Sequence, residues 1–282
     1  MTIIEAIVLG IIQGLTEFIP ISSTGHLTLA GKFLNLISED NPQSWTSFIA
    51  IIQLGTLISV LLYFWRDLYN ILSGFIKENL IERKTFTHQS LNSRLGWLII
   101  IGTIPIVIIG IGFKDVIEGN LTKNLYVISS SLIVLAIILF IAEKVASFRK
   151  DIDNVTIIDS IVVGLAQALA LIPGSSRSGT TITASLFLGM KRDVAARFSF
   201  LLSVPAIFAS GLLQLYEGLK TISPDMFINV IIATIVSAIS GYWAIDFLIK
   251  FLKTNSTKLF IVYRIALGLL IIVLLLTNTI KP

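Results

Sequence analysis

The first group of residues suited to chemistry lies between positions 13 and 26. Gln13 and Glu17 are four residues apart, so in a helix their side chains share one face. The run Ser22-Ser23-Thr24-Gly25-His26 follows and offers hydroxyl nucleophiles and a histidine. Histidine suits proton transfer near neutral pH and can also attack phosphorus. These residues predict a site for group transfer, and the alternative is a polar turn that caps a broken helix.

The second group is the run from Gly174 to Thr181, Gly-Ser-Ser-Arg-Ser-Gly-Thr-Thr. Backbone N–H groups at a turn before a helix form an anion site. Arg177 adds a planar fork that matches two phosphate oxygens. We therefore predict phosphate binding by Gly174, Ser176, Arg177, Ser178 and Thr181. The alternative is a structural ion pair between Arg177 and Glu17, which could coexist with the phosphate site and be released when the anion binds.

Composition shows which solvent must surround these groups. Of the 282 residues, 55% are hydrophobic and 13% are charged, and the mean hydropathy is +0.90. A soluble domain carries about 25% charged residues, so lipid must be the main solvent here. The apolar runs are continuous rather than alternating, which favours helices over a barrel. The chain has no cysteine, which excludes disulfides, thiolate metal sites and cysteine nucleophiles.

The apolar segments predict an all-α integral membrane protein. Six segments have the length of a transmembrane helix: 46–65, 95–113, 124–142, 198–216, 226–249 and 259–277. Two further segments, 3–31 and 157–190, are interrupted midway by proline, glycine and serine. A helix from Ile3 to Glu17 would span about 21 Å, too short for the hydrocarbon core. We expect both interrupted segments to be re-entrant helix–loop–helix elements.

The two interrupted segments resemble each other. Gly10-x-x-Gln13 precedes Pro20 and two serines, and Gly164-x-x-Gln167 precedes Pro173 and two serines, although the match needs single-residue gaps. Three spans follow each segment. The chain thus reads as a single membrane domain, 1–282, built from half-repeats at approximately 1–155 and 156–282.

The distribution of lysine and arginine predicts the orientation. If the loop 66–94 is cytoplasmic, fourteen basic residues lie on that side, and five lie opposite: Lys32, Lys114, Lys123, Lys220 and Lys281. This places the first re-entrant segment on the outer face and the second on the inner face. The halves would be inverted, with their polar tips meeting near the midplane.

The other charged or titratable residues singled out in the sequence are interpreted as structural, without a role in the chemistry. His88 lies in a polar loop, where solvent surrounds it. Asp246 and Lys250 are four residues apart at a helix end and are expected to form a surface pair. Arg264 lies five or six residues inside the last span, and we expect its side chain to snorkel to the interface.

Two motifs resemble the undecaprenyl-diphosphate phosphatase family, also called the bacitracin-resistance protein family. They are Gln13–Phe18 with Pro20–His26, and Pro173–Gly179, and the resemblance extends over essentially the whole chain. The family's functional positions fall on Gln13, Glu17, Ser23, His26, Ser176, Arg177, Ser178 and Thr181. The first acidic position is glutamine in this chain, which leaves one carboxylate fewer for a metal.

The resemblance implies hydrolysis of a polyprenyl diphosphate to its monophosphate, which recycles the carrier lipid for peptidoglycan synthesis and confers bacitracin resistance. It implies a multi-pass protein of the bacterial plasma membrane, with the active site open to the outer side. It also implies a divalent cation, Mg²⁺ or Ca²⁺, with Gln13 and Glu17 as its residues. The expected partners are the lipid substrate and membrane lipid, without nucleic acid, and a homodimer is left open.

The residues alone leave the mechanism open. Ser23 is the preferred nucleophile, with His26 or Glu17 as its base, and the alternatives are direct attack by His26 or by an activated water. A flippase or secondary transporter is the rival function, because inverted repeats with broken helices are typical of transporters. A transporter has no use for a nucleophile beside a base.

Overall fold

The computed structural model describes residues 1–37, 42–113, 117, 119–218 and 224–281. The α-helices in chain order are α1 (Ile3–Phe18), α2 (Ser23–Phe33), α3 (Pro42–Tyr63), α4 (Trp65–Ile76), α5 (Leu91–Gly112), α7 (Leu125–Val145), α8 (Ile157–Ala168), α9 (Arg177–Phe187), α10 (Arg192–Gly218), α11 (Pro224–Thr254) and α12 (Lys258–Leu276). The shorter 3₁₀ and π segments are η1 (Lys77–Ile81), η2 (Phe86–His88), η3 (Asn120–Lys123), η4 (Ile152–Asn154) and η5 (Leu169–Leu171).

Six helices of the described part of the chain are long and apolar enough to cross a membrane. They are Ser44–Tyr63, Leu91–Gly112, Leu125–Val145, Arg192–Tyr216, Met226–Thr254 and Lys258–Leu276. Each one contains most of a predicted span, so the expected all-α membrane protein with six transmembrane helices is confirmed. Several helices extend beyond the predicted spans, because a helix can continue past the hydrocarbon layer.

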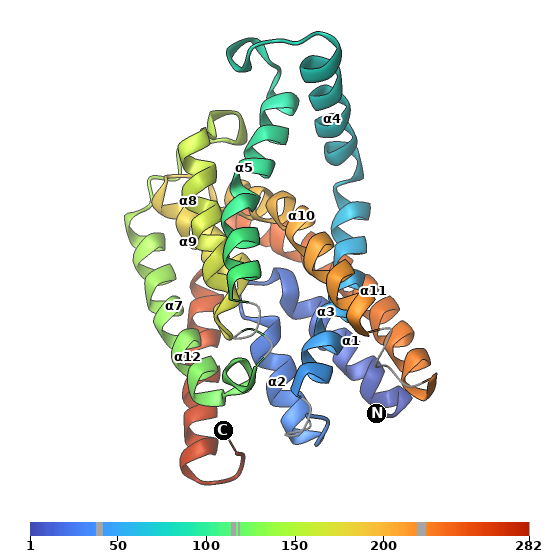
Figure 1. Ribbon diagram of the computed structural model, residues 1–282. Helices are drawn as coiled ribbons and strands as arrows, with labels where there is room; N and C mark the ends of the chain where they lie inside the picture. The colour runs from blue at the N-terminus through green and yellow to red at the C-terminus, as the bar shows by residue number, and fades with distance from the viewer. Residues whose placement is uncertain (38–41, 114–116, 118, 219–223, 282) are drawn as a thin grey trace.

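Two pairs of shorter helices complete the bundle. Helix α1 has 16 residues and α8 has 12, so they reach about 24 Å and 18 Å respectively. Each is followed by a tight turn and a helix of 11 residues, α2 or α9. The chain folds back at both turns, and the turns lie toward the middle of the bundle (Figure 1). The re-entrant course of these hairpins through a bilayer stays a prediction.

The two hairpins match residue by residue. In each, the first turn is a capping box, formed by Thr2 with Glu5 in α1 and by Thr156 with Asp159 in α8. Four pairs lie at one constant spacing along the chain: Thr2 and Thr156, Glu5 and Asp159, Gln13 and Gln167, Ser22 and Ser176. The two segments therefore align without gaps, and the single-residue gaps expected from the sequence are wrong. They came from matching two prolines that do not occupy equivalent positions.

The short helices pack against long helices from the other half of the chain. Helix α1 lies along α11, and α8 lies along α5. Both contacts are close because a glycine faces the neighbouring backbone: a Cβ atom at Gly10 would lie 2.6 Å from the Ala233 carbonyl oxygen, and one at Gly164 would overlap Gly102. At the end of α1, the Phe18 ring packs edge-on against Phe200 of α10, with centroids 5.1 Å apart. The halves therefore share one core.

Ion pairs join helices away from the hairpin tips. Arg192 of α10 binds Glu143 of α7, with 2.8 Å between Nε and Oε1, and Glu143 also accepts a 2.8 Å hydrogen bond from the Thr257 hydroxyl before α12. The predicted pair of Lys250 with Asp246 is confirmed at 2.8 Å. The contacts of Glu143 connect α7 with α10 and with the start of α12, while the pair of Lys250 with Asp246 lies within α11.

Both termini lie at one end of the bundle, and the segment that follows α4 lies at the other (Figure 1). The side chain of Lys32 donates to the carbonyl of Lys281, with 3.2 Å between Nζ and O, so these two positions share an end. Of the five basic residues expected on the outer side, Lys114 and Lys220 lie outside the described residues. The orientation relative to the membrane stays a prediction.

Candidate active site

A strained serine forms the tip of each hairpin. Ser22 has φ 75° and Ser176 has φ 68°, a region that residues other than glycine rarely adopt. Both serines are N-caps, and their side chains accept hydrogen bonds of 3.2 Å from the backbone N–H of Gly25 and Gly179. The first N–H groups of a helix have no intrahelical partner. Both tips can therefore present backbone donors to an anion.

Glu17 is the centre of the polar cluster between the tips. Its Oε1 accepts from Arg177 Nη2 at 2.6 Å and from Gln53 Nε2 at 2.7 Å. Its Oε2 accepts from Ser23 Oγ at 2.7 Å and from Gln13 Nε2 at 3.0 Å. The structure thus brings four predicted residues together, and it adds Gln53 of α3. The pairing of Arg177 with Glu17, considered from the sequence as a structural lock, is present.

The burial of this ion pair has an energetic consequence. The side chains of Arg177 and Glu17 are 9% and 3% exposed. Desolvating two charges costs several kcal/mol, and removing one partner of such a pair typically costs about 3–5 kcal/mol. The amide and hydroxyl donors around Glu17 offset part of this cost. One guanidinium nitrogen, Nη1 of Arg177, is buried and has no hydrogen-bond partner among the described residues. That nitrogen is a donor still available to a ligand.

The geometry distinguishes the two bases considered for Ser23. The Ser23 hydroxyl donates to the Glu17 carboxylate at 2.7 Å, a distance suited to proton transfer. His26 lies one turn further along α2 and has other partners. Its Nδ1 is 2.7 Å from the carbonyl oxygen of Ser22, and its Nε2 is 2.7 Å from the hydroxyl of Tyr263. In this arrangement Glu17, rather than His26, is placed to accept the Ser23 proton.

The second hairpin brings its predicted residues to the start of α9. The hydroxyls of Ser176 and Ser178 are 3.2 Å apart, and both side chains are buried. The Thr181 hydroxyl lies 2.6 Å from Ser199 Oγ of α10 and bonds the Arg177 carbonyl at 2.8 Å, so it faces α10. Gly174 has φ 85°, which permits the tight turn.

Arg264 is completely buried, so the expected snorkelling is wrong. Its Nη2 donates to the carbonyl of Ser175 at 3.0 Å and contacts that of Gly174 at 3.5 Å, while Nη1 lies 3.5 Å from the carbonyl of Pro20. One side chain from α12 thus joins the tips of both hairpins. Gly179 leaves room for it, because a Cβ there would lie 2.5 Å from Nη1. Snorkelling is excluded because the guanidinium is held by these carbonyls.

Sequence reasoning did not identify Gln53, Tyr263 or Ser199. Gln53 and Ser199 lie in predicted spans, where a polar side chain often marks a site, and this polarity was the available signal. Tyr263 adjoins Arg264, whose charge inside a span was the available signal. Which side of a helix faces the hairpins could not be read from apolar runs alone.

The predicted metal residues, Gln13 and Glu17, have surroundings that differ from those of a divalent cation site. The parts of the chain that the structure describes contain no group of three or more histidine, cysteine, aspartate or glutamate side chains placed to hold a metal. Both oxygens of Glu17 already accept two hydrogen bonds each. Gln13 Oε1 is buried and has no partner there. In this arrangement Gln13 and Glu17 do not form a ligand set for a cation.

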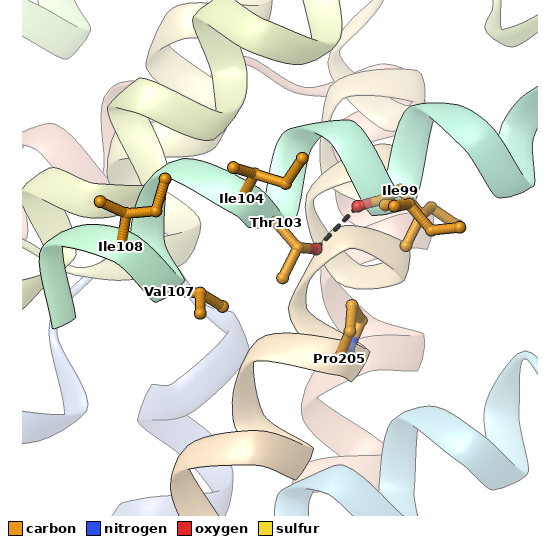
Figure 2. A pocket seen from close by; sticks show the side chains of 7 residues that line it. Ile99, Thr103, Ile104, Val107, Ile108 and Pro205 are labelled. Atoms are coloured by element: carbon orange, nitrogen blue, oxygen red, sulfur yellow. Dashed lines mark hydrogen bonds between the residues drawn. The ribbon is translucent and has the colours of Figure 1, made fainter. Parts of the chain in front are cut away.

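A separate apolar groove lies between α5 and α10 (Figure 2). Its volume is about 300 Å³, and its lining residues are Ile99, Ile100, Thr103, Ile104, Val107, Ile108 and Pro205. The Thr103 hydroxyl donates to the Ile99 carbonyl at 2.7 Å, so its polar group is satisfied. The groove has no group suited to chemistry. Its lining suits a hydrocarbon chain.

The chain is similar to known proteins over nearly its whole length. A family model described as bacitracin resistance protein BacA matches residues 6–270. The chain is 54% identical over 268 residues to an undecaprenyl-diphosphatase of Syntrophobacter fumaroxidans, covering 95% of each chain. It is 51% identical to one of Chloroherpeton thalassium, covering 98% of this chain and 97% of the relative, and 47% identical to one of Pelodictyon phaeoclathratiforme over the full length of both. With a family model covering nearly the whole chain and relatives this similar, the protein belongs to the bacitracin resistance protein BacA family.

Proposed function

We propose that the protein is an intramembrane phosphatase that hydrolyses undecaprenyl diphosphate to undecaprenyl phosphate and inorganic phosphate. The relatives named undecaprenyl-diphosphatase support this substrate. The observation that carries the proposal is the hydrogen bond of 2.7 Å from Ser23 Oγ to Glu17 Oε2, beside a buried arginine. A nucleophile, a base and a guanidinium fork in one cluster suit phosphoryl transfer.

In the first step, Ser23 Oγ attacks the terminal phosphorus of the diphosphate. The serine proton passes to Glu17, and the bond from that phosphorus to the bridging oxygen breaks. Undecaprenyl phosphate leaves, and the terminal phosphoryl group stays on Ser23. In the second step, water attacks this phosphorus and the bond to Ser23 Oγ breaks. The serine oxygen takes back the proton held by Glu17, and inorganic phosphate leaves with the two protons of the water. The hydrolysis of the phosphoserine returns the enzyme to its starting state.

Charge builds on the phosphoryl oxygens during both steps, and Arg177 is placed to stabilise it. Its Nη1 has no hydrogen-bond partner in the described part of the chain, while Nη2 holds Glu17. When the diphosphate binds, the guanidinium can turn its fork toward two phosphate oxygens, which weakens the pair with Glu17 and leaves that carboxylate as the base. The N-termini of α2 and α9 add backbone donors.

The groove between α5 and α10 suits the isoprenoid chain. Helix α10 connects it to the phosphate site: Ser199 bonds Thr181, and Pro205 lies six residues further on, roughly 9 Å along the helix. The diphosphate would then be held at the hairpin tips while its hydrocarbon chain remains among apolar side chains. Such a substrate can enter sideways from the lipid.

The bias in lysine and arginine supports an orientation with both termini outside the bacterial plasma membrane. The α1–α2 hairpin would then open to the outer face, and phosphate would be released outward. A divalent cation, which the family resemblance implies, would neutralise negative charge on the diphosphate, and Gln13 Oε1, which has no hydrogen-bond partner among the described residues, could offer it a neutral oxygen. No step of the reaction above depends on that cation.

Purified protein in detergent, supplied with undecaprenyl diphosphate, tests the proposal by release of inorganic phosphate. We expect wild-type protein to release phosphate, Ser23→Ala and Glu17→Gln to lose at least about a hundredfold in kcat, and Thr24→Ala, the neighbouring hydroxyl, to retain most of the rate. A wild-type protein that binds the lipid without releasing phosphate would favour a flippase and contradict the proposal.

A further inference from the structure

Gln167 is a completely buried amide in the last turn of α8. Neither its nitrogen nor its oxygen has a hydrogen-bond partner among the described residues. A buried polar group without a partner carries its full desolvation penalty, so nearly all such groups in proteins bind something. An amide of this kind inside an apolar bundle points to a ligand beside the second hairpin.

The two hairpins are alike at both ends, so equivalent residues occupy equivalent places. They begin with capping boxes, and their second helices, α2 and α9, both have 11 residues. Each second helix is followed by a residue of positive φ, Asn35 at 54° and Gly189 at 83°, at the same constant spacing. The contacts of the first hairpin therefore indicate what the second can hold.

In the first hairpin, two donors meet at one carboxylate oxygen. Gln13 Nε2 and Ser23 Oγ both donate to Glu17 Oε2, at 3.0 Å and 2.7 Å. At the constant spacing, their equivalents in the second hairpin are Gln167 and Arg177. The amide of Gln167 and the base of the Arg177 side chain therefore lie on two sides of one acceptor position.

The second hairpin has an apolar residue where the first has its carboxylate. Leu171 is the equivalent of Glu17, and it is partly exposed, whereas Glu17 is buried. Arg177 Nη2 reaches across to Glu17 of the other hairpin, while Arg177 Nη1 and Gln167 Nε2 have no acceptor in the described part of the chain. Two buried donors beside the equivalent of a carboxylate position predict that an anion binds there.

Gln167 also lies at the level of the groove between α5 and α10. Helices α5 and α8 run in the same direction, because the hydrogen bond from Ser160 to the Leu98 carbonyl and the contact of the two facing glycines both join positions 62 apart. At this spacing Gln167 lies level with Pro105, within the stretch of α5 that lines the groove. The phosphate nearest the isoprenoid chain is the inner phosphate of the diphosphate.

We propose that Gln167 is a substrate-binding residue, whose amide nitrogen donates to an oxygen of the inner phosphate, the one that remains on the lipid. This role rests on the proposed phosphatase activity. The diphosphate would lie with its terminal phosphate at Ser23 and Arg177 and its inner phosphate at Gln167, which directs the isoprenoid chain toward the groove. The amide oxygen can accept from a water that hydrates the same phosphate.

Binding of undecaprenyl phosphate tests this role, because that lipid carries the inner phosphate alone. The purified protein in detergent is titrated with it by calorimetry. We expect Gln167→Leu to raise Kd at least about tenfold, since a hydrogen bond to a charged group is lost. Inhibition by inorganic phosphate, which competes at the terminal position, should stay near the wild-type value. An unchanged Kd for the lipid, or an equal loss of affinity for inorganic phosphate, would overturn the inference.

The unfolding temperature without ligand separates binding from a structural role. The amide of Gln167 has no partner to lose, so Gln167→Leu should unfold at the wild-type temperature or above. Gln89→Leu is the matched control, because the Gln89 amide bonds Asn79, Lys84 and Ser93. It should lower the unfolding temperature and leave Kd unchanged. An equal fall in Gln167→Leu, with unchanged Kd, would assign a structural role and overturn the inference.

Gln167→Asn provides a second variant that keeps the amide and shortens its reach by one methylene. It should also raise Kd for undecaprenyl phosphate, and a wild-type Kd in this variant would count against a direct contact with the phosphate. Failure of the wild type to release phosphate from undecaprenyl diphosphate would instead contradict the proposed function. The comparison of Kd values needs no turnover, so it would still decide whether Gln167 binds the inner phosphate.

Discussion

Arg177 and Glu17 are 160 positions apart in the chain, yet the arginine Nη2 lies 2.6 Å from the glutamate Oε1. Each residue lies at the turn of its own hairpin, and the hairpins occupy matching positions in the two halves. The first half supplies a carboxylate, a hydroxyl and an imidazole, and the second supplies a guanidinium and backbone donors. A site divided in this way is complete only when both halves are folded together.

Arg177→Lys tests whether the fork of the guanidinium is needed. A lysine keeps one positive charge beside Glu17 but cannot make two parallel hydrogen bonds to phosphate. We expect kcat/KM for phosphate release to fall at least about a hundredfold, close to the loss in Arg177→Ala. Arg197→Lys, at the more exposed pair with Asp67, is the control and should retain most activity. Near-normal turnover in Arg177→Lys would refute a bidentate role.

Arg264→Gln tests the connection between the hairpin tips. The guanidinium is buried and contacts three backbone carbonyls, so its loss leaves those groups without their donor. Hydrogen bonds to charged groups contribute roughly 1.5–3 kcal/mol each, so we expect the free energy of unfolding to fall by about 3 kcal/mol. The measurement is thermal or denaturant unfolding in detergent. Lys258→Gln, at an exposed cation of the same helix, should change stability little, and equal effects of the two substitutions would contradict this role.

Ile104→Trp tests the groove between α5 and α10 as the site of the isoprenoid chain. The larger ring should fill the groove and raise KM for undecaprenyl diphosphate several-fold, while kcat stays near the wild-type value. A short substrate such as farnesyl diphosphate should be affected less, because it extends less far from the phosphate site. Ile137→Trp, at a similarly exposed position of α7, is the control. Equal KM increases for both chain lengths would contradict the assignment.

The spans and the site residues differ in how far they could be predicted. The six transmembrane helices were predictable because lipid requires long apolar runs, which are visible in a single sequence. The contact between Arg177 and Glu17 could also be predicted, since unpaired charges at membrane depth are unfavourable. Gln53, Tyr263 and the buried position of Arg264 depend on how α3 and α12 are rotated about their axes. That rotation is set by packing against the hairpins, which no local pattern encodes.

Labelling of single cysteines tests the orientation, because the natural chain has none. Cysteines introduced by Lys32→Cys and Lys281→Cys should react with an impermeant thiol reagent applied outside intact cells. A cysteine introduced by Lys84→Cys, in the segment after α4, should react only after the membrane is opened. Each variant is compared with its own total labelling in permeabilised cells. Labelling of the Lys84→Cys protein from outside would reverse the orientation.

Trapping the covalent intermediate tests the central claim most directly, that Ser23 is the nucleophile of a phosphatase site formed by both hairpins. Undecaprenyl diphosphate labelled in its terminal phosphoryl group is mixed with a stoichiometric amount of wild-type or Ser23→Ala protein, and the reaction is stopped within the first turnover. The reaction is quenched in acid, which preserves phosphoserine and destroys phosphohistidine, and peptides are analysed by mass spectrometry. We predict one labelled phosphoserine, at Ser23, and no labelled phosphoserine in protein that carries the Ser23→Ala substitution. An adduct at His26 in the wild-type reaction, detected after a parallel quench in alkali, or turnover of the wild type with no covalent adduct, would contradict this mechanism.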